Sequence, residues 1–155
     1  MDGVPATFMD KLKLIAFDAE DLAVISAHAQ DAVLKVGEMA YLPGEKRFAA
    51  VMNRFNWSRA LRTGKMEFQR RQSAVRFEHV LKARTSGLDL NRKADVLALL
   101  AVQFEAKGAD DPAGTVTLTF AGNGVVQLEV ECIEAELRDL GLQWRTRRRP
   151  KHSDD

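Results

Sequence analysis

The sequence predicts an α+β fold in a single domain, with about seven mostly antiparallel strands forming a bent sheet or a partly open barrel, one early helix and a C-terminal helix packed on the sheet. Three observations support this prediction. Apolar and polar residues alternate along several segments, as they do in half-buried strands. The connections between these segments are short, which favours antiparallel pairing. Two further segments carry apolar residues at helical spacing, and a helix at the end of the chain must cover an apolar face of the sheet or the mouth of a barrel.

The first elements are a strand and a helix. Residues 1–10 show no periodicity and are predicted to form a loose extension, after which residues 11–17 predict a short strand. Asp18 predicts the start of a helix, because an aspartate side chain can accept hydrogen bonds from the free N–H groups of a first turn. The apolar residues that follow are spaced to lie on one face of that helix: Leu22, Ile25 and Ala29.

Six further segments predict strands, because they show either alternation or a short continuous apolar run. They are residues 32–42, 47–57, 73–83, 96–106, 116–120 and 125–132. The chemistry of two turns predicts hairpins: Pro43-Gly44 separates the first two segments, and Asn123-Gly124 separates the last two.

The end of the chain predicts a second helix followed by a tail. Ile133, Leu137 and Leu140 recur at helical spacing, and Gly141 is placed to end the helix. Residues 145–155 are predicted to be a basic disordered tail, so the domain is expected to span residues 11–144. This order of elements resembles the pleckstrin-homology-like architecture in outline, a likeness that implies no function.

Composition limits the class of protein. The 155 residues are 46% hydrophobic and 29% charged, which is ordinary for a folded domain with a sizeable core. The longest apolar run, residues 96–102, is far shorter than the ~20 residues that a membrane-spanning helix requires. The N-terminus lacks the pattern of a secretory signal, and Cys132 as the single cysteine excludes an intrachain disulfide. We therefore expect a cytoplasmic protein.

The net charge of +1 hides an uneven distribution of charge along the chain. Residues 46–94 contain thirteen Lys or Arg and three acidic residues, whereas residues 105–139 contain eight acidic residues and two basic ones. If the fold keeps these segments apart, the molecule has a basic face and an acidic face. If neighbouring strands interleave them, the charges neutralise each other.

The segment NRFNWSRALRTGKMEFQRRQ, residues 53–72, interleaves basic and aromatic side chains. A basic surface attracts acidic partners by charge complementarity. The first functional hypothesis is therefore a non-enzymatic binding or interaction module that uses a basic surface over residues 54–76 for an acidic protein or an anionic ligand. The residues predicted to form this surface are Arg54, Arg59, Arg62, Lys65, Arg70 and Arg71.

Two other kinds of partner are open alternatives, and no membrane partner is expected. Phe55, Trp57 and Phe68 could stack on unpaired bases while arginines contact phosphates, which would make the protein a weak nucleic-acid binder. The sequence pI of about 7.9 and the lack of a nucleic-acid-binding signature speak against this alternative. A basic face could also pair with the acidic face of a second copy and give a homo-oligomer.

An enzyme, or an enzyme accessory, is the rival hypothesis. Thr117, Glu129 and Glu131 are predicted to form a polar patch on the C-terminal hairpin, and paired carboxylates can bind a cation or divide acid and base roles. Cys132 and His79 each continue an apolar alternation, so both are expected in the core. No nucleotide-binding fingerprint is present. The sequence predicts no catalytic residue, no cofactor and no metal.

Four long phrases of the sequence resemble one family. They are LKLIAFDAEDLAVISAHAQDAVLKVGEMAYLP (residues 12–43), RFAAVMNRFNW (residues 47–57), RFEHVL (residues 76–81) and GTVTLTFAGNGVVQLEVECIEAELRDLGLQW (residues 114–144). Together they are similar to the bacterial family known as domain of unknown function 2948, found mainly in alphaproteobacteria. The resemblance covers most of residues 11–149 and implies a single-domain cytoplasmic protein without an assigned activity, cofactor or site residue. Residues 58–69 are expected to be a local insertion between these phrases.

Overall fold

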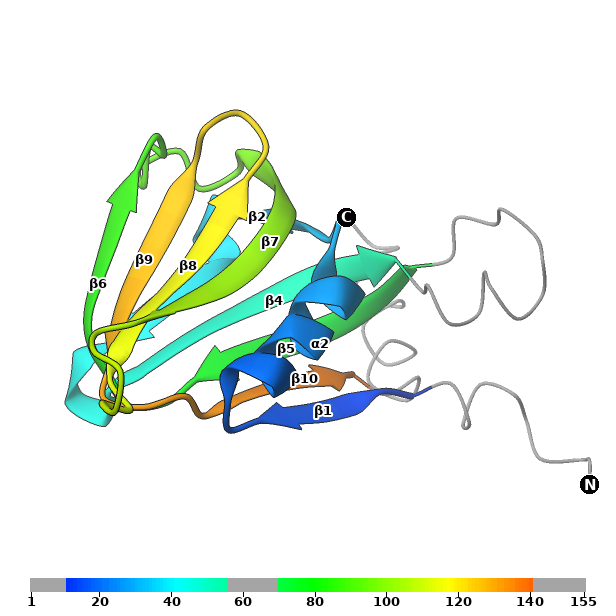
Figure 1. Ribbon diagram of the computed structural model, residues 1–155. Helices are drawn as coiled ribbons and strands as arrows, with labels where there is room; N and C mark the ends of the chain where they lie inside the picture. The colour runs from blue at the N-terminus through cyan, green and yellow to red at the C-terminus, as the bar shows by residue number, and fades with distance from the viewer. Residues whose placement is uncertain (1–10, 56–69, 141–155) are drawn as a thin grey trace, which may run out of the picture.

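The computed structural model describes residues 11–55 and 70–140 (Figure 1). Within these residues the chain forms ten strands, one α-helix and two short 3-10 helices. In chain order they are β1 (Lys13–Ala16), α2 (Ala19–Ala29), β2 (Val33–Lys35), η1 (Val36–Glu38), β3 (Met39–Leu42), η2 (Pro43–Glu45), β4 (Arg47–Phe55), β5 (Arg70–Phe77), β6 (Val80–Ser86), β7 (Val96–Ala106), β8 (Gly114–Phe120), β9 (Val125–Val130) and β10 (Ala135–Asp139). The predicted extension over residues 1–10 and the predicted tail over residues 145–155 lie outside the described residues.

The strands form one antiparallel sheet in the order β1-β10-β5-β4-β2-β7-β8-β9-β6, with β3 paired to β4 outside this path. Because β5 pairs along one edge of β4, β2 and β3 share the other edge. The sheet bends into two layers: β1, β10, β5 and β4 make one, and β7, β8, β9 and β6 make the other (Figure 1). The bend brings β6, the edge strand of the second layer, back toward β3.

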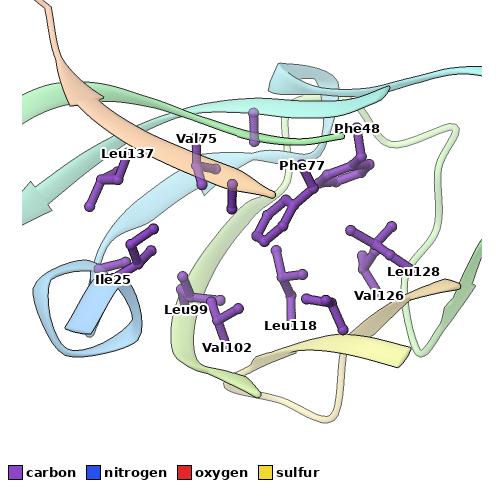
Figure 2. Close-up of a cluster of buried hydrophobic side chains, with 14 of the residues drawn as sticks. Ile25, Phe48, Val75, Phe77, Leu99, Val102, Leu118, Val126, Leu128 and Leu137 are labelled. Atoms are coloured by element: carbon purple, nitrogen blue, oxygen red, sulfur yellow. The ribbon is translucent and has the colours of Figure 1, made fainter. Parts of the chain in front are cut away.

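The core lies between the two layers, where apolar side chains of both layers meet (Figure 2). Phe48 of β4 and Phe77 of β5 point inward toward Leu118 of β8 and Leu128 of β9 (Figure 2). The centroids of the two phenylalanine rings are 6.4 Å apart and the rings are tilted by 45°, which is a favourable arrangement of aromatic pairs. Removal of these side chains from water is the main force that holds the layers together.

The helix α2 packs against β1 and β7 and thereby connects the first strand with the second layer (Figure 1). Asp18 caps it, since its Oδ1 accepts a hydrogen bond from the N–H of Asp21 at 2.8 Å. The N–H of Val102, beside a bulge in β7, donates to Oγ of Ser26 at 2.9 Å. The buried face of the helix consists of Leu22, Ile25 and Ala29. No helix among the described residues has both the length and the apolar character to cross a membrane.

The predicted α+β class, with two helices and roughly seven strands, is wrong: the described residues form a mostly β fold with ten strands and a single α-helix. The predicted antiparallel pairing is confirmed. Two of the additional strands arise where a predicted continuous strand turns a corner. Residues 32–42 divide into β2 and β3 around η1, and residues 73–83 divide into β5 and β6. The predicted pleckstrin-homology-like outline required a terminal helix that covers the sheet. The last described element is the strand β10, so this part of the prediction is wrong too.

The corner between β5 and β6 lies at His79, whose φ angle is +59°. This left-handed conformation is uncommon for a residue other than glycine and interrupts the regular alternation of a strand. The chain therefore passes from one layer to the other, and Phe77 before the corner is buried whereas Leu81 after it is exposed. The ring of His79 is partly exposed, and its Nε2 lies 2.8 Å from Oε1 of Glu134, so its predicted place in the core is wrong.

The predicted C-terminal helix is instead the strand β10, which pairs with β1 on one edge and with β5 on the other. Ala135, Leu137 and Asp139 are buried at alternate positions of this strand. The last of these inward positions carries a carboxylate, so the alternation of apolar residues stops at Leu137. Leu137 and Leu140 then match a helical spacing by coincidence.

Candidate functional site

The edges of β3 and β6 lie close together but are not paired with each other. Among the described residues, hydrogen bonds join them at one end only. The Tyr41 hydroxyl donates to the Val80 carbonyl oxygen at 3.0 Å, and the Val80 N–H donates to the Lys46 carbonyl oxygen at 2.9 Å. Beyond Val80, β6 pairs only with β9. We call this opening the β3/β6 seam.

A cleft of about 240 Å³ opens along the β3/β6 seam. Its floor reaches the core at Phe48 and Val126, which are almost fully buried. Three of its residues carry polar groups, namely Tyr41, Thr85 and Lys93. The other lining residues are Val36, Met39, Ala40, Ala83 and Leu90. A hollow that is mostly apolar and has a few polar groups is the usual form of a ligand-binding site.

Backbone contacts hold Lys93 at the side of the cleft. The N–H of Gly37 donates to the carbonyl oxygen of Lys93, and the N–H of Val36 donates to that of Asp95, both at 2.9 Å. A Cβ at position 37 would lie only 3.0 Å from the Cβ of Lys93, so a glycine permits this close approach. No described residue forms an ion pair with the Lys93 ammonium group, which therefore brings an uncompensated positive charge to the cleft.

Two of the six residues predicted to form the basic surface are buried. Arg54 and Arg71 are only 1% and 8% exposed, because both occupy inward-facing positions of their strands. Arg70 is exposed, and its Nη1 donates hydrogen bonds to the carbonyl oxygens of Asp31 and Asn53. The remaining members, Arg59, Arg62 and Lys65, lie outside the described residues.

The alternative of a nucleic-acid surface loses a member for the same reason. Phe55 is only 6% exposed and cannot offer its ring to an unpaired base. Trp57 and Phe68, the other two predicted stacking residues, lie outside the described residues, and so does the whole of the predicted insertion over residues 58–69.

Arg54 belongs to a buried ionic cluster centred on Asp139. Oδ1 of Asp139 accepts hydrogen bonds from Arg54 Nε at 2.8 Å and from Ser73 Oγ at 2.7 Å. Oδ2 accepts from Arg54 Nη2 at 2.7 Å and from the Leu12 N–H at 2.9 Å. Burial alone would raise the pKa of Asp139, but the hydrogen bonds from Arg54 and Ser73 outweigh it and lower this pKa. The cluster fastens β4, β5 and β10 to the start of β1.

Of the two possible distributions of charge, the described residues show the interleaved one. β5 lies beside β10 and β6 beside β9, so at two places in the sheet a strand of the basic segment is the direct neighbour of a strand of the acidic segment. The resulting ion pairs are Arg76 with Glu136 at 3.0 Å, Arg84 with Glu129 at 3.0 Å and Lys46 with Glu131 at 3.6 Å. These pairs neutralise much of the segregation that the sequence shows.

The predicted polar patch does not converge on one point. Thr117 lies opposite Gln127 rather than opposite Glu129. Glu129 is paired with an arginine of β6, whereas Glu131 follows the end of β9 and lies 3.8 Å from the ring of His79. Glu129 lines a second hollow, of about 300 Å³, at the end of the β8–β9 hairpin that lies opposite its turn. Among the described residues, none of the groups with a shifted pKa lines that hollow.

Cys132 does not have the properties of a nucleophile. Burial, together with the nearby carboxylates of Glu134 and Glu131, raises the pKa of its thiol. A raised pKa lowers the thiolate fraction at neutral pH, and the thiolate is the reactive form. Within residues 11–55 and 70–140, no group of three or more His, Cys, Asp or Glu side chains is arranged to hold a metal ion.

Sequence reasoning missed the residues of the cleft. Tyr41, Ala83 and Thr85 look like ordinary positions in alternating strands, and Lys93 lies in a polar connection. Leu90 offered the clearest signal, since it is an apolar residue within that polar connection, and the structure leaves it 51% exposed beside the cleft.

Comparison with known proteins gives one match. A family model described as "Protein of unknown function (DUF2948)" matches residues 12–152. No curated protein and no solved structure matches the chain. The matched residues include every described element from β1 to β10, and hence both the cleft and the ionic cluster.

Proposed function

The chain belongs to the DUF2948 family, and from that premise we propose that it is a non-enzymatic binding module whose binding site is the cleft at the β3/β6 seam. One observation carries this proposal: an apolar hollow reaches the core between two strands that are not paired with each other. An apolar ligand that displaces water from such a hollow gains the free energy of burying both surfaces.

The polar groups of the cleft favour a ligand that also has an anionic group. Lys93 supplies a positive charge, and Thr85 supplies a hydroxyl that can donate or accept a hydrogen bond. The Tyr41 hydroxyl already donates to the Val80 carbonyl, so it can offer a ligand only its acceptor lone pairs. The expected ligand therefore combines an apolar body with a carboxylate or a similar anion.

This proposal keeps the predicted acidic or anionic partner but moves its site. The cleft takes the role that the sequence gives to the basic surface, because Arg54 and Arg71 are buried. Arg59, Arg62 and Lys65 lie outside the described residues, and their contact with a partner stays a prediction.

A titration with anilinonaphthalene sulfonate tests the proposal, since this fluorescent probe has an apolar body and one anionic group. Saturable binding to the folded protein is expected. The variant Thr85→Phe fills the cleft and should lose most of the binding, whereas Lys93→Ala should weaken it by about 0.5–1 kcal/mol by removing one exposed charge interaction.

Two matched controls separate the cleft from general effects. Gln127→Phe adds the same aromatic side chain on the exposed face of β9, and Lys82→Ala removes a lysine that does not line the cleft. Both should bind the probe as the wild type does, with unfolding by urea confirming that all variants fold. Equal binding by Thr85→Phe and the wild type would reject the cleft as the site.

A further inference from the structure

We infer that the natural occupant of the cleft is an extended segment of a protein partner, which adds to the free edge of β6 as an additional strand and carries apolar side chains at alternate positions with acidic side chains between them. This inference rests on the proposed function and names the partner of the same site. It follows from the direction of the backbone groups of β6, from the faces of its side chains and from the charges beside it.

The hydrogen bonds of the β8–β9 hairpin fix the direction of the backbone groups. The N–H of Phe120 donates to the carbonyl oxygen of Gly124 at 2.8 Å. Backbone groups alternate in direction along an antiparallel strand, so the even-numbered residues of β9 point toward β8 and the odd-numbered ones toward β6. Gln127 is therefore directed at β6, where it lies opposite Arg84. The N–H and C=O of Arg84 consequently pair with β9.

The backbone groups of the residues before and after Arg84 point away from β9. The backbone N–H and C=O groups of Ala83 and Thr85 face away from β9 and into the β3/β6 seam. No described residue forms a hydrogen bond with these four groups, although Val80 at the start of the strand has both of its own groups bonded across the seam. An edge with free groups of this kind is a template for one more strand.

The side chains of β6 set the pattern of the incoming segment. Ala83 lies opposite Leu128 and Thr85 opposite Val126, both of which are buried, so their side chains face the interior and line the cleft. Residues of an added strand that lie opposite them have their side chains on the same face. These residues enter the cleft and must be apolar, while the residues between them face solvent.

The charges beside the edge favour acidic residues at the solvent-facing positions. Lys82 and Arg84 are exposed on the outer face of β6, and Lys93 lines the cleft itself. Arg84 is paired with Glu129, whereas no described residue forms an ion pair with Lys82 or Lys93. Opposite charges across neighbouring strands stabilise the pairing, and like charges weaken it.

The same charges argue against a second copy of the chain at this edge. Two β6 strands paired with each other would bring Lys82 and Arg84 of both copies together on one face. A small ligand, for its part, fills the cleft without satisfying the four backbone groups of Ala83 and Thr85. A peptide strand supplies donors and acceptors at the spacing that these groups require.

The test uses a fluorescein-labelled nine-residue peptide in which valine and glutamate alternate, with binding followed by fluorescence anisotropy. Three forms of the peptide are compared: unmodified, N-methylated at the valine amides, and N-methylated at the glutamate amides. In the antiparallel pairing that the rest of the sheet shows, the valine residues opposite Ala83 and Thr85 donate their N–H groups to these two residues, so methylation there removes the two donors that reach β6. The loss of two hydrogen bonds should weaken binding about tenfold or more. Methylation of the glutamate amides should change it by less than about threefold.

Protein variants add a second readout. The peptide should displace anilinonaphthalene sulfonate from the wild-type cleft, and Thr85→Phe should weaken both ligands. Lys82→Glu should weaken the peptide but leave the probe unchanged, since Lys82 lies on the outer face of the strand and not in the cleft.

The possible failures are distinguishable. If the probe binds in the cleft and the peptide does not, the strand addition is overturned while the proposed function stands. If neither binds, both are overturned. Equal weakening by the two methylated peptides would reject pairing with the β6 edge. A dimer in sedimentation velocity that the Lys82→Glu change strengthens, because the glutamate would then face Arg84 of the other copy, would overturn the inference in favour of a second copy.

Discussion

At the end of β4 the interior of the sheet holds an arginine and a carboxylate whose hydrogen bonds are made, whereas along β6 four backbone groups beside an apolar cleft have no partner among the described residues. Both regions place polar groups next to the core. In the ionic cluster each carboxylate oxygen of Asp139 accepts two hydrogen bonds, and three strands and Leu12, the residue before β1, contribute to it. At the β3/β6 seam, Val80 is the one described residue of β6 that forms hydrogen bonds across the gap.

The difference separates polar groups that hold the fold together from polar groups that are available to a partner. A buried charge is stable only when it is fully paired, so the cluster around Asp139 is fixed and has no capacity for a ligand. The seam has the opposite properties, because its apolar surface is incompletely covered and the backbone groups of Ala83 and Thr85 have no partner among the described residues. Variants that remove groups from each region should therefore change different quantities: stability for the cluster, and binding for the seam.

The largest effect is expected at the cluster. The change Asp139→Ala leaves the guanidinium of Arg54 buried without its carboxylate, and removal of one partner of a buried ion pair costs about 3–5 kcal/mol. Unfolding by urea, followed by circular dichroism, measures the loss. The double variant Arg54→Met/Asp139→Leu removes both charges and fills the space with apolar groups, so it should be less destabilised than Asp139→Ala. Equal losses in the two variants would contradict a role for the unpaired charge.

The pH dependence of stability should carry the signature of the same carboxylate. The pKa of Asp139 in the folded protein lies below its ordinary value, so the ionised form contributes stability at pH values above the unfolded-state pKa of about 3.9. This contribution is lost as the pH falls from that value through the lower folded-state pKa. The wild type should thus lose stability below a pH of about 4 more steeply than Asp139→Asn, as measured by urea midpoints at a series of pH values. Parallel curves for the two proteins would assign the acid sensitivity to other groups.

A smaller effect is expected where the seam is fastened. Tyr41→Phe removes the hydroxyl that donates to the Val80 carbonyl, a loss of about 1 kcal/mol in the free energy of unfolding. The Val80 amide should also exchange its hydrogen faster, because the Val80 carbonyl oxygen no longer accepts a hydrogen bond and the strand opens more easily at this residue. Hydrogen exchange measures this rate. An unchanged rate at Val80 would mean that the bond to the Lys46 carbonyl alone fastens the seam.

The fold was only partly predictable from the sequence, and the successes and failures have local causes. The helix after Asp18 and the hairpin around Asn123 depend on interactions between near neighbours, and both are present. β10 depends instead on a distant partner: the inward position of Asp139 is stable only because Arg54, which lies two strands away on β4, donates hydrogen bonds to its carboxylate. A pattern of apolar residues cannot reveal such a pair, so it misassigned the strand as a helix.

The candidate site was less predictable for a related reason. The basic residues of β4 and β5 attract attention in the sequence, but strand alternation turns Arg54 and Arg71 inward. The cleft joins residues of β3 with residues of β6, which are neighbours only because the sheet bends back on itself. Periodicity shows which residues face a core, but it does not show which two edges of a sheet meet.

The smallest effect on stability is expected from an ion pair at the free edge of β6. Arg84 and Glu129 are 3.0 Å apart, but their side chains are 50% and 40% exposed. Water screens such a pair, so a double-mutant cycle with Arg84→Ala and Glu129→Ala should give a coupling below about 0.5 kcal/mol in urea unfolding. The same Arg84→Ala change should weaken the alternating valine–glutamate peptide, because Arg84 stands beside the solvent-facing positions of the added strand. A coupling energy comparable to that of the buried cluster, with peptide binding unchanged, would place this pair with the groups that hold the fold together and would remove Arg84 from the binding edge.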